Sequence, residues 1–308
     1  MGWSKGARVS SSQPAGGDLR APGPSESPVI DHRAAAPGQP GRQRPMSSPS
    51  RARRLANALA GPIVVLAVLV GIWYFVSYVV LTPDRRFLLP PLQQVIETAF
   101  MQHANLMVLL DALGVTAEVA MVGLGLAILI GVSIAIAMSE SRSLERGFYP
   151  YLVVLQTIPI LAIVPLIGFW IGFGFVARVV VCVLISLFPL IANTHFGLQS
   201  FTQPQRELFD LHRAGRLTKL IKLKIPMALP ATFAGFRISA GLSVIGEIVG
   251  GYFFERGSPD LGGLLVVFLS RLDGAMLFGA IMLSAALGVV VFWVFGAISQ
   301  VVVGRWKE

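Results

Sequence analysis

Residues 61–81 read GPIVVLAVLVGIWYFVSYVVL, a run of 21 residues without a charged side chain. About 20 apolar residues in helical conformation are enough to cross the hydrocarbon core of a bilayer. Trp73, Tyr74 and Tyr78 lie toward one end of the run, as expected of rings that favour the membrane–water interface. The stretch therefore predicts a first transmembrane helix.

The rest of the chain repeats this pattern. Only 13% of its residues are charged and 54% are hydrophobic, whereas soluble domains carry about 25% charged residues. We therefore predict an all-α membrane protein with about six transmembrane helices. Pro159 and Pro165 are expected to break the third, and Gly172 to Gly174 to form a tight turn after it. The five further apolar runs cover approximately residues 113–138, 149–171, 176–198, 231–254 and 276–303.

Polar segments flank and separate these runs. Residues 1–54 are rich in Gly, Pro, Ser, Ala and Arg and predict a disordered basic tail, with Met46 as an alternative start. Residues 82–110 are expected to form an extracytoplasmic loop with a short amphipathic helix. Residues 255–273 predict a polar, glycine-rich loop, and residues 304–308 a short cytoplasmic tail.

The distribution of basic residues predicts the orientation. Counted on alternate sides of the six runs, 16 Lys and Arg near the membrane fall on one side and five on the other. Basic loops stay in the cytoplasm, so both termini and residues 199–224 are predicted to be cytoplasmic in a multi-pass protein of the bacterial cytoplasmic membrane. The net charge of +9 is therefore assigned to anionic lipid. Nucleic acid is not an expected partner, because few aromatic residues accompany the basic ones.

The longest charged interruption contains a distinctive segment. Residues 207–230 read ELFDLHRAGRLTKLIKLKIPMALP, with apolar residues at steps of three to four. This spacing predicts short amphipathic helices. Gly215 is expected to end the first of them in a left-handed conformation, and Pro226 to lie in the first turn of the next span. Such a segment either docks into a partner or lies flat on the membrane as an anchor.

The segment resembles the cytoplasmic EAA loop of ABC importer permeases, the binding-protein-dependent inner-membrane components, and most closely the nitrate/sulfonate/taurine-type group. Glu207 stands at the position of the EAA glutamate, and Pro226 follows 19 residues later. The likeness covers about residues 111–303. Further motifs that carry it are Gln156-Thr-Ile-Pro159, Val164-Pro165-Leu166, Phe169-Trp-Ile-Gly172, Phe188-Pro189-Leu-Ile-Ala-Asn193-Thr194 and Gly235-Phe-Arg-Ile238.

The resemblance implies a type I ABC importer permease fold over residues 111–303, with a coupling loop at 199–224. It implies three partners: cytoplasmic ABC ATPase subunits, an extracytoplasmic solute-binding protein and usually a second identical permease. It also implies a small substrate, either a nitrate-, sulfonate- or taurine-like anion or a small heterocycle. The residues expected to couple the chain to its ATPase are Glu207, Leu208, Leu211, Arg213, Ala214, Gly215 and Pro226.

The chain departs from the family pattern at three places. Leu208 and Phe209 replace the two alanines, and Arg213 occupies the usual glycine position, with Gly215 two residues later. An acidic residue common in this group near position 251 is replaced by Gly251. The departures at Leu208, Phe209 and Arg213 bear on how the loop docks. None of the three changes the predicted class.

Five residues inside the predicted spans are candidates for the translocation pathway: Gln156, Pro159, Pro165, Asn193 and Glu247. A charge in the bilayer core costs at least about 2.5–3.5 kcal/mol on insertion scales, which marks Glu247 as functional or as a neutral, hydrogen-bonded carboxyl between helices. The prolines either free carbonyls toward a cavity or kink their helix for packing. Asn193 is expected either to line the translocation pathway or to form an interhelical hydrogen bond.

Other classes of protein are disfavoured by missing motifs. The sequence lacks the phosphate-binding G-x-x-x-x-G-K-[ST], so ATP hydrolysis is expected on a partner subunit. It also lacks H-E-x-x-H, and its single cysteine and four scattered histidines predict no catalytic residue, metal or cofactor. The alternative is a secondary transporter or channel without an ATPase, which predicts more intramembrane charges or inverted repeats.

Overall fold

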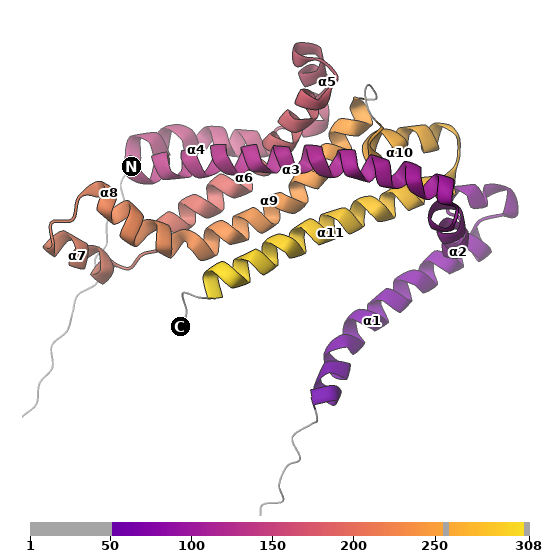
Figure 1. Ribbon diagram of the computed structural model, residues 1–308, viewed down its shortest axis with the longest axis horizontal. Coiled ribbons are helices and arrows are strands. Elements are labelled where there is room, and N and C mark those ends of the chain that lie inside the picture. Colours follow the sequence, from indigo (N-terminus) through magenta and orange to yellow (C-terminus); the bar gives the residue numbers. More distant parts are fainter. Residues whose placement is uncertain (1–50, 255–258, 305–308) are drawn as a thin grey trace, which may run out of the picture. The chain divides into compact units, whose positions relative to one another are not determined.

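Every element that the structure describes is helical. The computed structural model describes residues 51–254 and 259–304, and no strand occurs among them (Figure 1). The predicted all-α fold is therefore confirmed. Residues 1–50 of the predicted disordered tail, with the alternative start at Met46, lie outside the described residues. Residues 51–54 already belong to helix α1, so for these four residues the prediction is wrong.

The first part of the chain forms two long helices joined by short helical segments, and then a bent pair. A π-helical turn at Val76–Val80 extends α1. A 3-10 helix at Pro83–Leu88 and a π-helical turn at Ile96–Met101 flank α2. The α-helices are α1 (Arg51–Phe75), α2 (Leu92–Val95), α3 (His103–Glu140), α4 (Arg142–Thr157) and α5 (Ile160–Ile171).

The second part contains the central helices and the basic segment. A π-helical turn at Leu220–Lys224 joins α8 to α9 without a break. The α-helices here are α6 (Phe175–Leu198), α7 (Gln203–Leu211), α8 (Arg216–Lys219), α9 (Ile225–Phe253), α10 (Leu261–Ser270) and α11 (Gly274–Gly304).

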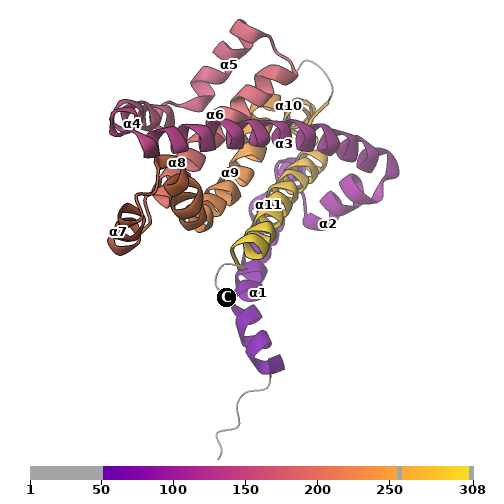
Figure 2. The ribbon, with the colours of Figure 1, turned by 60° about the vertical axis from the view of Figure 1, so that its left-hand side comes forward.

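Five helical runs in the described part are long and apolar enough to cross a membrane: α1, α3, α6, α8 continued into α9, and α11. The bent pair α4 and α5 provides a sixth if it counts as one span. The axes of these two helices differ by 100°, and α5 points away from its neighbours in both views (Figures 1 and 2). The predicted number of spans is therefore confirmed.

The break in this pair lies at Pro159 alone. Pro159 precedes the first residue of α5 with φ −66°, while Pro165 lies inside α5. The prediction that Pro165 also breaks the span is wrong. The chain has already turned at Pro159, and in the second turn of the new helix a proline removes one backbone hydrogen bond without ending the helix.

Helices α6 and α9 form the centre of the bundle and pack closely through small residues. The Ser186 Oγ donates to the Ser239 carbonyl at 3.2 Å, and the Ser239 Oγ donates back to the Ser186 carbonyl at 2.8 Å. A Cβ on Gly246 would lie only 2.9 Å from the Cα of Cys182. Small residues and side-chain hydrogen bonds are the usual means of helix association in membranes, where apolar surface gives no preference for protein over lipid.

The predicted polar loop at 255–273 contains an apolar helix, α10, so that prediction is wrong. Leu261 and Phe268 of α10 are buried in a cluster with Leu109 of α3 and Ala280 of α11. The glycines that were interpreted as loop residues allow close packing. A Cβ on Gly262 would lie 2.4 Å from the carbonyl oxygen of Ile248 in α9. The same cluster explains why α3 begins at His103, ten residues before the predicted span.

Candidate functional site

The basic segment between α6 and α9 forms a short helix with a well-defined start. Thr202 precedes α7 and forms a capping box with Gln205: its side chain accepts from the Gln205 amide, and the Thr202 amide donates to Gln205 Oε1 at 2.9 Å. Caps of this kind contribute about 1 kcal/mol to helix stability. The capping box therefore sets the start of α7, in the segment where the amphipathic pattern predicted a helix.

Helix α7 presents apolar side chains to its surroundings. Leu208 is 54% exposed and Leu211 is 82% exposed, whereas Ala214 beyond the helix is half-buried. Glu207 lies on the exposed surface and accepts from Gln203 Nε2 at 2.8 Å. The predicted apolar face is thus present, although Ala214 contributes less exposed surface to it than Leu208 and Leu211.

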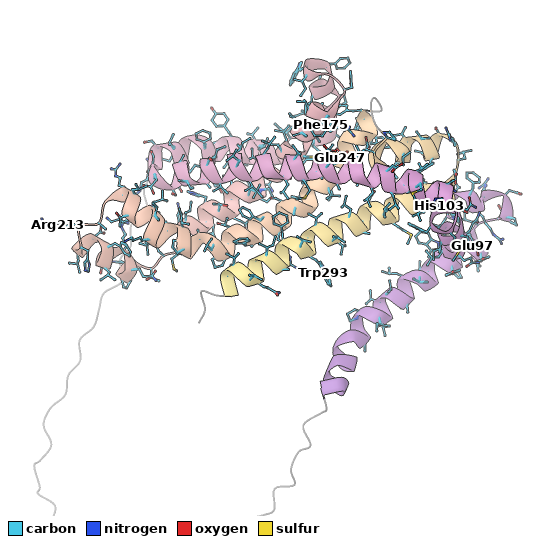
Figure 3. All side chains as sticks on the ribbon, viewed as in Figure 1. Glu97, His103, Phe175, Arg213, Glu247 and Trp293 are labelled. Atoms are coloured by element: carbon cyan, nitrogen blue, oxygen red, sulfur yellow. The ribbon has the colours of Figure 1, made fainter. Side chains whose placement is uncertain are left out.

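The chain turns after α7 at Arg213 rather than at Gly215. Arg213 has φ 51°, in the left-handed region that favours glycine (Figure 3 shows it at the tip of this segment). Gly215 has φ −66° and ψ 164°, and it precedes α8 as its N-cap. The prediction that Gly215 ends the first helix in a left-handed conformation is therefore wrong. The left-handed position is the one where the family pattern places its glycine.

Ion pairs hold this segment together and tie it to the end of α3. Lys219 of α8 donates to Asp210 of α7, and this hydrogen bond holds the pKa of the Asp210 carboxyl below its ordinary value. Lys224 Nζ donates to Glu140 Oε1 at 2.6 Å and to the Ser139 carbonyl at 2.9 Å. Pro226 lies in the first turn of α9, where the sequence predicted a proline.

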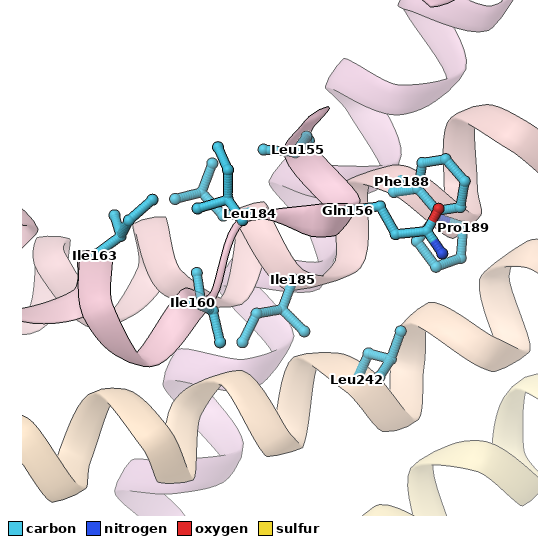
Figure 4. A pocket seen from close by; sticks show the side chains of 10 residues that line it. Leu155, Gln156, Ile160, Ile163, Leu184, Ile185, Phe188, Pro189 and Leu242 are labelled. Carbon is cyan, nitrogen blue, oxygen red and sulfur yellow. The ribbon is translucent and has the colours of Figure 1, made fainter. Parts of the chain in front are cut away.

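A pocket of about 320 Å³ lies beside the bend between α4 and α5 (Figure 4). Gln156, one of the pathway candidates, supplies the polar side chain of its lining, and Pro159 lies between two of the lining residues. Pro165 is not among the lining residues. The pocket is lined by Leu155, Gln156, Ile158, Ile160, Ile163, Leu184, Ile185, Phe188, Pro189 and Leu242.

Asn193 does not join this pocket. Its Nδ2 donates to the Pro189 carbonyl of its own helix at 2.8 Å, and among the described residues Asn193 makes no interhelical hydrogen bond. Its Cβ lies 2.9 Å from where a Cβ on Gly235 would stand, at the crossing of α6 and α9. The geometry indicates a packing residue whose amide hydrogen-bonds within its own helix.

Glu247 is held in a buried ionic cluster that the sequence did not predict. Its side chain is fully buried, and its Oε1 lies 3.3 Å from Arg178 Nη1 (Figure 3 labels Glu247 within the bundle). The same nitrogen lies 2.5 Å from Asp260 Oδ2, while Asp260 Oδ1 accepts from the Gly263 amide as the N-cap of α10. Glu247 Oε2 and Arg178 Nε have no hydrogen-bond partner in the part of the chain that the structure describes.

Two signals in the sequence could have found this cluster. Arg178 stands at the start of an apolar run, and in the structure it lies in the first turn of α6 and is buried. Asp260 directly precedes the apolar run that begins at Leu261, where an N-cap residue is expected. Gly251 is part of the same arrangement, because a Cβ on it would lie 2.0 Å from Asp260 Oδ1. The Asp260 carboxylate thus occupies the space that a side chain at 251 would need.

Comparisons with known proteins agree with this architecture. A model of the family described as binding-protein-dependent transport system inner membrane component matches residues 127–307. A probable ABC transporter permease protein of Haemophilus influenzae is 31% identical over 235 residues, which are 76% of this chain and 93% of that protein.

Two further relatives have names that include a transported compound. The formylaminopyrimidine transport permease protein ThiX of Halalkalibacterium halodurans is 31% identical over 75% of this chain and 90% of its own length. The riboflavin transport system permease protein RibX of Chloroflexus aurantiacus is 31% identical over 54% of this chain and 61% of its own. The chain therefore belongs to the binding-protein-dependent transport system inner membrane components and is a multi-pass permease subunit of the ABC importer type.

Proposed function

We propose that residues 199–224 couple this permease to a separate ATPase in the cytoplasm, and that a solute-binding protein delivers its substrate from the other side. The observation that carries the coupling role is the exposure of Leu208 and Leu211 on a capped helix next to the spans. Burying a leucine side chain contributes about 1.5–3 kcal/mol, so the pair offers substantial docking energy to a protein groove.

The connection between α8 and α9 supports transmission of movement from this contact. Residues Arg216–Phe253 form one helical run of 38 residues, through the π-helical turn at 220–224. A partner that displaces α7 therefore pulls on α9 through a continuous helix and through the Asp210–Lys219 pair. Helix α9 contributes Leu242 to the pocket beside the α4–α5 bend. ATP-driven closure of the ATPase then biases a two-state bundle.

The orientation is part of the proposal. The excess of basic residues on the side of residues 199–224 remains when the buried Arg178 is left out of the opposite count, and it supports a cytoplasmic location for this segment and both termini. ATP hydrolysis belongs to the partner, because the sequence lacks a phosphate-binding loop.

We further propose a small heterocycle, rather than a small oxyanion, as the substrate. Nine of the ten residues that line the pocket beside the bend have apolar side chains, and the tenth is the uncharged Gln156. An unpaired anion in such surroundings would lose its hydration without compensation, whereas a flat, weakly polar ring would pack there and hydrogen-bond to an amide. The names of ThiX and RibX, which refer to a pyrimidine and to riboflavin, support this choice.

Uptake by the assembled transporter tests both proposals. The chain is reconstituted with its ATPase and its binding protein, and ATP-dependent uptake of radiolabelled formylaminopyrimidine, riboflavin and taurine is measured. We expect uptake of a heterocycle and not of taurine. Uptake of taurine alone would overturn the substrate and leave the permease role intact, and ATP-independent uptake would overturn the coupling role.

The coupling contact has its own test. Leu211→Glu places a charge in the docking face of α7, and we expect it to reduce ATP-dependent uptake at least about tenfold, because burying an unpaired charge costs several kcal/mol. Leu88→Glu is the matched control, since Leu88 is also exposed but lies outside residues 199–224. Both variants must be present in the membrane at wild-type amounts. Full uptake by Leu211→Glu would refute the proposed contact.

A further inference from the structure

A second pocket lies at the end of the bundle where α3, α4, α6 and the coupling segment meet (Figures 1 and 2 show α4, α7 and α8 at this end). Its volume is about 550 Å³, and its character is opposite to that of the pocket beside the α4–α5 bend. Its lining carries five cationic side chains: Arg142, Arg206, Arg216, Lys219 and Lys224. The function proposed above does not use it.

The carboxylates near this pocket do not balance its cations. Glu140 is paired with Lys224 at 2.6 Å. Asp210 is shared between Lys219 and Arg206, the latter at 3.8 Å. Glu145 interacts with His195 Nε2 at 3.0 Å and accepts from Gln199 Nε2 at 3.1 Å. Five cations therefore face three carboxylates, an excess of two.

Two guanidinium groups of this lining lie outside these ion pairs. In the described part of the chain, neither Arg142 nor Arg216 has a carboxylate within the 4.0 Å limit of an ion pair. Arg142 is the first residue of α4, a helix of 16 residues, and Arg216 is the first residue of α8. Both line the same pocket from segments 74 positions apart in the sequence.

We propose that this pocket binds a phosphate-bearing anion between Arg142 and Arg216. Two planar guanidinium groups need several acceptor oxygens in one small group, and a tetrahedral phosphate provides them with matching charge. The first turn of α4 adds favourable electrostatics for an anion. The volume leaves room for the remainder of a larger molecule, and basic pockets between membrane helices accept anionic lipid headgroups as well as soluble phosphates.

Binding there would affect the coupling segment. Arg216 begins the helical run that continues into α9, and only Ser141 separates Arg142 from the end of α3. A phosphate held by both would hold α8 against the α3–α4 connection, next to the existing Lys224–Glu140 pair. The anion would thus stabilise one position of the coupling segment relative to the spans.

Thermal unfolding of the purified full chain in detergent tests the site with inorganic phosphate. Tm is measured against phosphate concentration at constant ionic strength, with chloride as the balancing anion. We expect phosphate to raise the Tm of the wild type, and the double variant Arg142→Gln, Arg216→Gln to need at least about tenfold more phosphate for the same rise. The control is Lys222→Gln, an exposed lysine of the same segment that does not line the pocket.

A second arm distinguishes the source of the phosphate group. The chain is placed in nanodiscs of phosphatidylcholine with or without phosphatidylglycerol, and retained lipid is counted by native mass spectrometry. Retention of phosphatidylglycerol that the double variant loses, without an effect of inorganic phosphate, assigns the site to lipid. The opposite pattern assigns it to a soluble phosphate. No phosphate response and no retained lipid in the wild type would overturn the proposal, as would equal responses in the double variant and Lys222→Gln.

Discussion

Arg178 shares one buried guanidinium between two acidic residues on different elements. Glu247 comes from the C-terminal part of α9 and Asp260 is the N-cap of α10, so the cluster joins α6, α9 and α10. A buried charge without a partner is far more costly than a buried pair. The short contact to Asp260 and the longer one to Glu247 indicate that Arg178 and Asp260 form the main pair.

This arrangement predicts unequal effects of removing the two partners. Arg178→Met leaves two carboxylates without a cation and should lower the free energy of unfolding by about 3–5 kcal/mol. Glu247→Gln keeps an oxygen acceptor for Arg178 and removes the excess carboxylate, so its cost should stay below about 1 kcal/mol. Unfolding in a detergent titration measures both. Equal losses of unfolding free energy in the two variants would show that Arg178 needs the negative charge of Glu247.

Arg213 is an arginine in a backbone conformation that suits glycine. A left-handed conformation costs an L-residue roughly 1–2 kcal/mol, and glycine does not carry that cost. We therefore expect Arg213→Gly to raise the free energy of unfolding by about 1 kcal/mol at most. Glycine relieves the left-handed strain, but it also increases the conformational entropy that the chain loses on folding. The measurement is the thermal unfolding of the full chain.

The matched control for this change is Lys222→Gly in the π-helical turn, which removes the same charge at a helical position. Glycine within a helix costs about 0.5–1 kcal/mol, so this control should lower stability. A loss of stability in both variants would mean that the strain at Arg213 is offset by contacts of its side chain.

At the scale of elements, the length of the apolar runs predicted the spans correctly. The wrong predictions concerned glycines and prolines, whose structural role depends on what packs against them. A run of apolar residues predicts a membrane helix whatever its neighbours are, so α1, α6 and α11 lie close to their predicted ranges. Whether Gly262 serves a loop or a close helix contact depends on what lies opposite it, which no local pattern contains. The Arg178 cluster escaped prediction for the same reason, since its members are 69 and 82 residues apart.

The contact between α10 and α9 gives a prediction with a control in the next residue. Gly262→Ala would place a Cβ 2.4 Å from the Ile248 carbonyl oxygen, and the backbone there cannot move aside easily. We expect it to cost about 1–3 kcal/mol, as other cases of overpacking do. For Gly263→Ala the nearest atom is Asp260 Oδ1 at 3.6 Å, an ordinary contact. Limited proteolysis at α10 and thermal unfolding compare the two; equal behaviour would argue against close packing at Gly262.

At the scale of the whole molecule, one chain leaves much apolar surface that its own core does not cover. A groove of about 700 Å³ lies between α9 and α11, and Trp293 at its edge is 70% exposed (Figure 3). Lipid alone could cover such an apolar surface. Arg237 also lies on this side, however, with its guanidinium 3.8 Å from the centre of the Phe292 ring. Among the described residues, Arg237 forms no ion pair. Cations within spans generally face protein or water rather than lipid.

We therefore expect the α9–α11 groove to face a second copy of the chain, the partner that the resemblance to ABC importer permeases implies. In a twofold dimer, a residue near the symmetry axis lies close to its own copy. In a Cys182→Ser background, Ile245→Cys in the groove should form disulfide-linked dimers in membranes under mild oxidation, because Ile245 is half exposed there. Val65→Cys on α1, whose span is almost entirely exposed, is the control and should stay monomeric. If Ile238→Cys, Ile245→Cys and Val289→Cys all remained monomeric while the intact transporter contained two permeases, this groove would face lipid or a different permease chain, and the pathway would have to form on another face of the bundle.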